Sequence, residues 1–172
     1  MKDHIHRMIR VDQAGEFGAT RIYAGQLAVM GDRGPHSGEI AAMARQEDEH
    51  HDAFNALMAE RGVRPTALHP FWSVAGYALG AATALIGPKA AMACTAAVET
   101  EIDLHYSKQL DELKDADEDP ELQGMIEQFR EEEREHHDAA IAAGAEETPG
   151  YPLLSAAIRL GCRAAIRLSE RV

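Results

Sequence analysis

The sequence of 172 residues predicts an all-α fold, a four-helix bundle of two repeated helical hairpins with an apolar crossover helix and a C-terminal amphipathic helix. Alanine is abundant and aromatic residues make up only 5% of the chain, which favours helices over sheets. No segment shows the apolar–polar alternation expected of a strand. The pentapeptide Glu-His-His-Asp-Ala occurs twice, at 49–53 and 135–139, and indicates an internal repeat.

The first hairpin consists of two predicted helices, at about 3–30 and 38–61. Gly31 and Pro35 interrupt the helical pattern after the first helix, and Gly62 ends the second. Glycine and proline are poorly tolerated in helix interiors, so these positions are natural boundaries.

The crossover follows the first hairpin. Residues 71–86 are apolar and contain no charged side chain, and we expect a crossover helix at about 68–87. Gly87 ends it, and Pro88 suits the first position of the next helix, which is expected to run to about Lys114.

The second hairpin is completed after an acidic loop at 115–119. Asp119 suits the N-cap and Pro120 the first turn of a helix that is expected to reach about Ala143. A last amphipathic helix is expected at about 153–171.

The composition argues against nucleic acid as the main partner. The formal net charge is −12, with 29 acidic against 17 basic residues, so a polyanion would be repelled. The length suits a single domain, residues 1–172. Cys94 and Cys162 form no Cys-x-x-Cys motif, which favours a reducing compartment. No signal or transit peptide precedes the first predicted helix, so we expect a bacterial protein or one whose transit segment was removed.

Each copy of the pentapeptide supplies the histidine of a Glu-x-x-His motif. The first motif joins Glu47 to His50, and the second joins Glu133 to His136. Positions i and i+3 share one face of a helix, so each pair can bind one metal ion side by side. Their repetition in equivalent helices predicts a site for two metals.

The second histidine of each copy is a poorer candidate ligand. His51 has the same spacing from Asp48, but the equivalent of Asp48 in the second copy is Arg134. We therefore expect His51 and His137 to lie at the surface or behind the ligands. Two aspartates near the motifs are candidate hydrogen-bond acceptors for a ligand histidine of another helix: Asp52 and Asp138.

The other two bundle helices each carry one carboxylate at a matching position. Glu16 and Glu99 lie among apolar residues, and each is followed two turns later by a tyrosine, Tyr23 and Tyr106. An isolated carboxylate on an apolar face is costly, and two metals would offset that cost for all four glutamates. This arrangement of four glutamates and two histidines is the di-iron or di-manganese pattern of ferritin-like proteins. The tyrosines are expected in the core, with a redox or hydrogen-bonding role as the alternative.

Two segments carry apolar surface beyond the predicted bundle. The crossover, interrupted by Gly76 and Gly80, is expected either to be buried or to lie in a membrane interface or line a tunnel for a lipid. The last helix carries arginines at every fourth position, a basic stripe that suits anionic lipid headgroups; pairing with acidic faces of the bundle is the alternative. These are Arg159, Arg163, Arg167 and Arg171.

Four motifs, in matching order and spacing, resemble the demethoxyubiquinone hydroxylase family over nearly the whole chain. They are Val-Asp-Gln-Ala-Gly-Glu-Phe-Gly-Ala at 11–19, Gln-Glu-Asp-Glu-His at 46–50, Cys-Thr-Ala-Ala-Val-Glu at 94–99 and Glu-Glu-Arg-Glu-His-His-Asp at 132–138. The resemblance implies a ferritin-like bundle that uses O2 to hydroxylate a polyprenyl methoxy-methyl-benzoquinol, demethoxyubiquinol, in ubiquinone biosynthesis.

The resemblance also implies a set of site residues and partners. Two iron ions (Fe2+) would be held, with Glu47 and Glu133 able to bridge them. His105 and Tyr106 match a family pair that could aid electron or substrate delivery. We expect a peripheral protein on the cytoplasmic face of the bacterial cell membrane, and a homo-oligomer or a ubiquinone-biosynthesis protein as candidate partner. The ligands carried over are Glu16, Glu47, His50, Glu99, Glu133 and His136.

Two other functions compete with the hydroxylase. A ferritin- or rubrerythrin-like metal-binding or storage protein predicts cage assembly or a rubredoxin-like Cys-x-x-Cys domain, and the sequence has no such motif. A membrane-surface module with a structural metal predicts lipid binding without oxygen consumption, but it leaves the open coordination positions unexplained.

Overall fold

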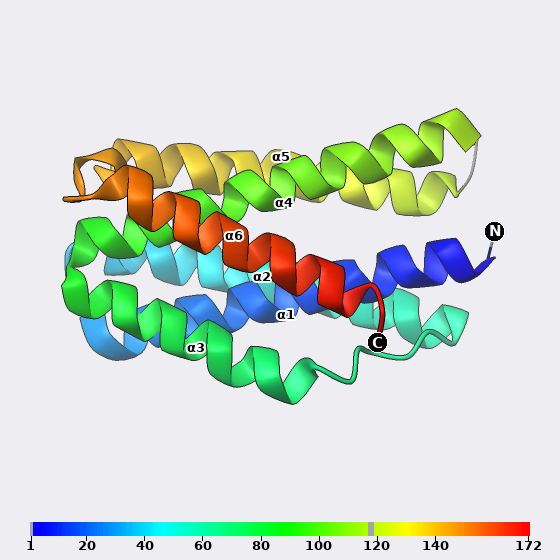
Figure 1. Ribbon diagram of the computed structural model, residues 1–172, viewed down its shortest axis with the longest axis horizontal. Helices are drawn as coiled ribbons and strands as arrows, with labels where there is room; N and C mark the ends of the chain where they lie inside the picture. Colours follow the sequence, from blue (N-terminus) through cyan, green and yellow to red (C-terminus); the bar gives the residue numbers. More distant parts are fainter. Residues whose placement is uncertain (1, 117–118) are drawn as a thin grey trace.

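The computed structural model describes residues 2–116 and 119–172, and within these ranges it contains six α-helices, one short 3₁₀ helix and no strand. Figure 1 shows the long helices lying side by side as a bundle, so the predicted all-α fold is confirmed. The elements are α1 (Lys2–Met30), α2 (Ser37–Arg61), α3 (His69–Ile86), α4 (Pro88–Ala116), α5 (Pro120–Ala142), η1 (Ala145–Glu147) and α6 (Tyr151–Ser169).

Two predicted boundaries need correction. The acidic loop was placed at 115–119, but α4 continues through Ala116, while residues 117–118 lie outside the described part of the chain. The last helix begins at Tyr151, two residues before its predicted start, because Gly150 in a left-handed conformation (φ 75°) ends the preceding turn. The predicted cap of α5 is present, since the carboxylate of Asp119 accepts a hydrogen bond from the backbone N–H of Leu122 at 3.1 Å.

In the part of the chain that the structure describes, two of the three apolar clusters of the core lie on either side of the candidate site. One cluster contains large side chains from the α2 C-terminal half and the α5 N-terminal half, such as Phe54 and Ile126. The other contains mainly small side chains, such as Ala93 and Ala140. On each of α1, α2, α4 and α5, the predicted metal-binding residues fall between the two clusters in sequence. The apolar clusters therefore surround a polar centre and separate it from the ends of the bundle.

Helix α3 lies against α1 at unusually short range. A Cβ on Gly80 would overlap the carbonyl oxygen of Ile22, and one on Gly76 would lie 2.9 Å from the carbonyl oxygen of Gly18. The two glycines that interrupt the crossover therefore form the contact surface with α1. The opposite face of α3 is not buried, since Val74 is 70% exposed. The crossover helix is therefore buried on its α1 side and exposed on the other.

Helix α6 is attached to α4 by a buried carboxylate. Glu101, only 4% exposed, accepts hydrogen bonds from Nε of Arg159 at 2.6 Å and from Nε and Nη2 of Arg163, both at 2.9 Å. Two of the four arginines therefore pair with the bundle, whereas Arg167 and Arg171 are exposed. Figure 1 shows α3 and α6 on the same side of the molecule, and Trp72 Nε1 of α3 donates to Ser169 Oγ of α6 at 3.1 Å. Among the described residues, no helix is long and apolar enough to cross a bilayer.

Candidate metal centre

The structure brings all six predicted residues to the middle of the bundle. Their side-chain ligand atoms form two overlapping groups, within each of which all atoms lie within 4.8 Å of one another. Both groups include Glu47 and Glu133, and every member is buried. One group is Glu16, Glu47, His50 and Glu133; the other is Glu47, Glu99, Glu133 and His136.

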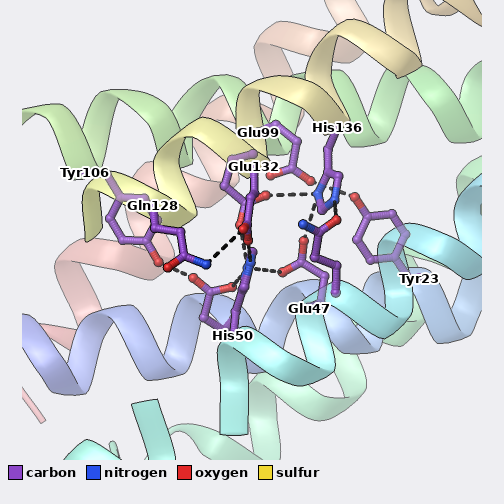
Figure 2. Close-up of polar contacts among 11 residues, drawn as sticks. Tyr23, Glu47, His50, Glu99, Tyr106, Gln128, Glu132 and His136 are labelled. Carbon is purple, nitrogen blue, oxygen red and sulfur yellow. Dashed lines mark hydrogen bonds and ion pairs between the residues drawn. The ribbon is translucent and has the colours of Figure 1, made fainter. Parts of the chain in front are cut away.

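Both imidazoles direct Nδ1 toward the carboxylates. Nδ1 of His50 lies 3.1 Å from Glu133 Oε1 and 3.6 Å from Glu16 Oε2. Nδ1 of His136 lies 3.1 Å from Oε1 of Glu47 and 3.1 Å from Oε2 of Glu133. Figure 2 shows the rings of His50 and His136 reaching the shared carboxylate of Glu47 from different sides. The ring of His50 is held in place by stacking on Phe129, with centroids 4.0 Å apart.

The other ring nitrogens point away from the carboxylate cluster and cross to the opposite helix. Nε2 of His50, on α2, lies 2.5 Å from Oε2 of Glu132 on α5. Nε2 of His136, on α5, lies 3.0 Å from Oε1 of Gln46 on α2. Gln46 and Glu132 each immediately precede a motif glutamate, so they occupy equivalent positions in the repeat. This equivalence could have identified them as the hydrogen-bond partners of the histidines, but the sequence interpretation did not use it.

The aspartates predicted as acceptors for the ligand histidines lie elsewhere. Asp52 is exposed, and Asp138 is exposed and lies 3.1 Å from the adjacent His137. A residue five positions after the motif glutamate projects away from the bundle axis, so the prediction for Asp52 and Asp138 is wrong. His51 is half-buried and lies 3.1 Å from Nε2 of Gln13 on α1, outside the carboxylate cluster.

The two buried tyrosines each contact a carboxylate of the opposite hairpin. Tyr23 of α1 donates its hydroxyl to Oε1 of Glu99 on α4 at 2.8 Å. Tyr106 of α4 donates to Oε1 of Glu16 on α1. Of the two roles that the sequence left open for these tyrosines, the structure shows hydrogen bonding.

His105 does not reach the carboxylate cluster. Its Nε2 lies 3.0 Å from Oδ1 of Asp12, a buried carboxylate that also accepts from Nε2 of Gln109 at 2.9 Å. The imidazole therefore sits beside Tyr106 in sequence but belongs to a separate polar network between α1 and α4.

The carboxylates differ in their affinity for protons. Burial and the charge of Glu133 raise the pKa values of Glu47 and Glu99 well above the usual range. Burial alone would raise the pKa of Glu133 too, but the hydrogen bonds from His136 and His50 outweigh it and lower that pKa. Burial disfavours the charged form of His50, yet the adjacent carboxylates of Glu133 and Glu16 raise its pKa to about 11. Without a metal, two protonated carboxyl groups therefore surround a buried ion pair.

The donor set fits two divalent cations. Buried oxygens of three of these carboxylates accept no hydrogen bond from the described part of the chain: Glu16 Oε2, both Oε atoms of Glu47, and Glu99 Oε2. Buried polar atoms without partners are rare in proteins because they lose the hydration of the unfolded state. Two cations would satisfy these oxygens, and a mainly oxygen donor set with one imidazole per ion suits iron or manganese.

An apolar cavity lies on the outer side of α1 and α4. It has a volume of about 480 Å³ and is lined by residues of α1, α3, α4 and α6. Its lining includes Gly15 and Val98, which immediately precede Glu16 and Glu99 in the sequence. The cavity therefore adjoins the helix segments that carry two of the candidate ligands.

A family model described as ubiquinone biosynthesis protein COQ7 matches residues 3–169. The chain belongs to the COQ7 family. This confirms the resemblance to the demethoxyubiquinone hydroxylases that the four motifs indicated.

Relatives in the COQ7 family match almost the whole chain. The 3-demethoxyubiquinol 3-hydroxylase of Rhodospirillum rubrum is 55% identical over 168 residues, which cover 98% of this chain and 78% of the relative. The mitochondrial NADPH-dependent 3-demethoxyubiquinone 3-hydroxylase of Homo sapiens is 51% identical over 170 residues, with the same coverage of 98% and 78%. The mitochondrial 5-demethoxyubiquinone hydroxylase of Saccharomyces cerevisiae is 43% identical over 182 residues.

Proposed function

We propose that this chain is an O2-dependent monooxygenase that hydroxylates the ring of a polyprenyl demethoxyubiquinol in ubiquinone biosynthesis. The observation that carries the proposal is a pair of overlapping Glu/His groups beside an apolar cavity, in a family whose relatives are named hydroxylases. A metal pair provides oxygen chemistry, and the cavity provides a place for an apolar substrate.

Two iron ions are the proposed cofactor. One would be held by Glu16 and His50 and the other by Glu99 and His136, with Glu47 and Glu133 shared between them. Ferrous iron in such a pair supplies the electrons that activate O2 for insertion into an electron-rich ring. The contribution of the chain is positional, since Tyr23 and Tyr106 fix the directions of the unshared carboxylates.

The cavity is the proposed site of the substrate. Its walls are almost entirely apolar side chains, which suit a polyprenyl chain and a methylated ring. The small residues Gly15 and Gly18 of α1 leave room on the side next to Glu16. An apolar ring bound there would be kept from water while it lies near the candidate ligands. His105 and Tyr106, whose ring centroids lie 6.1 Å apart, are the proposed pair that aids electron or substrate delivery.

The exposed apolar faces of α3 and α6 support association with a membrane surface. Large apolar side chains on these two helices are exposed: Phe71, Val74, Leu85, Ile86, Leu153, Leu160 and Leu168. Arg167 and Arg171 add positive charge next to them, which favours anionic headgroups. We propose the cytoplasmic face of the bacterial cell membrane, where the cavity beneath α3 and α6 would open toward the lipid.

The activity is tested with iron-loaded protein, a reductant, a demethoxyquinol and ¹⁸O2. One ¹⁸O atom is expected in the ring of the product and the other in water, as detected by mass spectrometry. Glu99→Ala should lower the iron content and abolish ring labelling, whereas Glu135→Ala on the exposed face of α5 should retain both. Iron uptake without any label in the quinol would contradict the hydroxylase and indicate storage.

Membrane binding is tested by cosedimentation with vesicles containing anionic lipid. Val74→Glu on α3 should weaken binding, because it places a charge in the apolar face. Ala59→Glu makes the same charge change on an exposed position of α2 and is the matched control. Equal binding of the two variants would contradict the proposed membrane face.

A further inference from the structure

The two candidate metal positions are alike in almost every donor. Each has one imidazole, shares Glu47 and Glu133, and has one further carboxylate that accepts a tyrosine hydroxyl. The repeat of the two hairpins explains this likeness, because equivalent helices supply equivalent residues. A difference between the positions must therefore come from outside this matched set.

The residues behind the histidines provide that difference. His50 has the carboxylate of Glu132 at Nε2, whereas His136 has the amide oxygen of Gln46 there. The two contacts are equivalent in the repeat, but only one acceptor carries a negative charge. The contact to Glu132 is also shorter, 2.5 Å against 3.0 Å, as expected of a charge-assisted hydrogen bond.

The same contacts leave Nδ1 of each ring as the nitrogen for a metal ion. The amide oxygen of Gln46 accepts only, so Nε2 of His136 keeps its proton, and Nδ1, which faces the carboxylates, would bind a metal ion in place of a proton. Glu132 holds Nε2 of His50 in the same way, so a metal ion would displace the proton on Nδ1 of His50, which faces Glu133. Glu132 is held by a second bond, since Nε2 of Gln128 donates to its other oxygen at 3.0 Å, as Figure 2 shows.

We propose that Glu132 makes the two metal positions unequal, so that the ion bound by His50 is held more tightly than the ion bound by His136. A carboxylate that accepts a hydrogen bond from the N–H of an imidazole makes the other ring nitrogen more basic, and this nitrogen then binds a metal ion more strongly. An amide oxygen has the same effect much more weakly. Glu132 is thus a positioning and tuning residue that acts through His50. The inference rests on the proposed metal centre.

The test is an anaerobic titration of metal-free protein with Fe2+ against a competing chromophoric chelator, which yields two dissociation constants. Wild type should give constants that differ by tenfold or more. Glu132→Gln keeps the side-chain shape and should weaken the tighter site by about 10- to 100-fold. Gln46→Glu should strengthen the weaker site.

Two further variants separate this local effect from general electrostatics and assign each constant to a histidine. Glu135→Gln removes the same charge from an exposed position of α5 and should shift both constants equally and less than threefold. In His136→Ala, the tight constant should remain and should respond to Glu132→Gln.

The outcomes distinguish the inference from the proposed function. Two equal constants in wild type, or equal effects of Glu132→Gln and Glu135→Gln, would overturn the inference and leave the metal centre intact. Wild-type protein that binds fewer than two ions would overturn both.

Discussion

The hydroxyl of Tyr23 on α1 donates to Oε1 of Glu99 on α4 at 2.8 Å, across the interface between the two hairpins. Tyr106 on α4 makes the reciprocal contact with Glu16 on α1. Each hairpin therefore orients a candidate ligand of the other, and the two unshared carboxylates are fixed only when the hairpins pack together. This makes the metal centre sensitive to side chains that do not themselves reach it.

Tyr23→Phe should lower metal affinity without unfolding the protein. The phenyl ring still fills the buried site, but Glu99 loses the donor that fixes its direction. Loss of a hydrogen bond behind a ligand typically costs 10- to 100-fold in metal affinity, and we expect about that loss in a chelator competition. Tyr77→Phe, on the partly exposed surface of α3, is the control and should leave affinity unchanged. Unaltered affinity in Tyr23→Phe would show that Glu99 needs no such support.

The metal-free protein should lose stability as pH rises. Burial and neighbouring carboxylates raise the folded-state pKa values of Glu47 and Glu99 above the ordinary 4.5, so the folded chain keeps protons that the unfolded chain releases above that pH. His50, raised from 6.5 to about 11, contributes stability that is present below 6.5 and lost between 6.5 and 11. Both effects have the same sign, because the folded state binds more protons. The lowered pKa of Glu133 affects stability only below about pH 4.5, where this carboxylate begins to take up a proton in the unfolded chain.

Urea unfolding of the metal-free protein at about pH 6 and pH 9 measures this loss. Each additional proton held by the folded state changes the unfolding free energy by about 1.4 kcal/mol per pH unit. Glu99→Gln should reduce the slope, because its amide does not titrate. Metal-loaded protein should show a smaller slope, since the cations replace the protons. Stability that increases over this range in the metal-free protein would contradict the prediction.

Gly80→Ala should destabilise the contact between α1 and α3. The added methyl group would overlap the backbone of Ile22, which cannot move aside as a side-chain end can. Overpacking of this kind costs about 1–3 kcal/mol. Gly124→Ala on α5 is the matched control, because a Cβ there would meet no atom of another described segment within 4 Å and alanine favours helix by up to about 1 kcal/mol. Similar unfolding midpoints for the two variants would show that α3 shifts freely on α1.

Glu101→Gln should loosen α6 while leaving the bundle folded. The substitution removes the charge that both Arg159 and Arg163 contact, and hydrogen bonds to charged groups contribute about 1.5–3 kcal/mol. Hydrogen exchange should accelerate in residues 151–169 more than in α5. Glu147→Gln, which removes an exposed ion pair with Lys89, should leave exchange in α6 unchanged. Unchanged exchange in Glu101→Gln would place the attachment of α6 in its apolar contacts instead.

Much of the architecture could be predicted because the relevant signals are local. Glycine and proline positions predicted the helix ends to within a few residues, and the cap at Asp119 followed from its side-chain chemistry. The repeat singled out six candidate ligands, and all six lie together. Their role as ligands stays a proposal, but their convergence follows from helical periodicity, which places i and i+3 on one face.

The sequence by itself determined which residues face the bundle axis, since that depends on spacing along each helix. Only the tertiary structure decided which residues meet across it. The acceptors behind the histidines are Glu132 and Gln46 rather than Asp52 and Asp138, because the contact depends on how α2 and α5 are aligned. Likewise, the packing of α6 on α4 decides which arginines of the basic stripe pair with Glu101 and which stay exposed to solvent. Such choices depend on the relative positions of helices distant in sequence, and no local pattern encodes them.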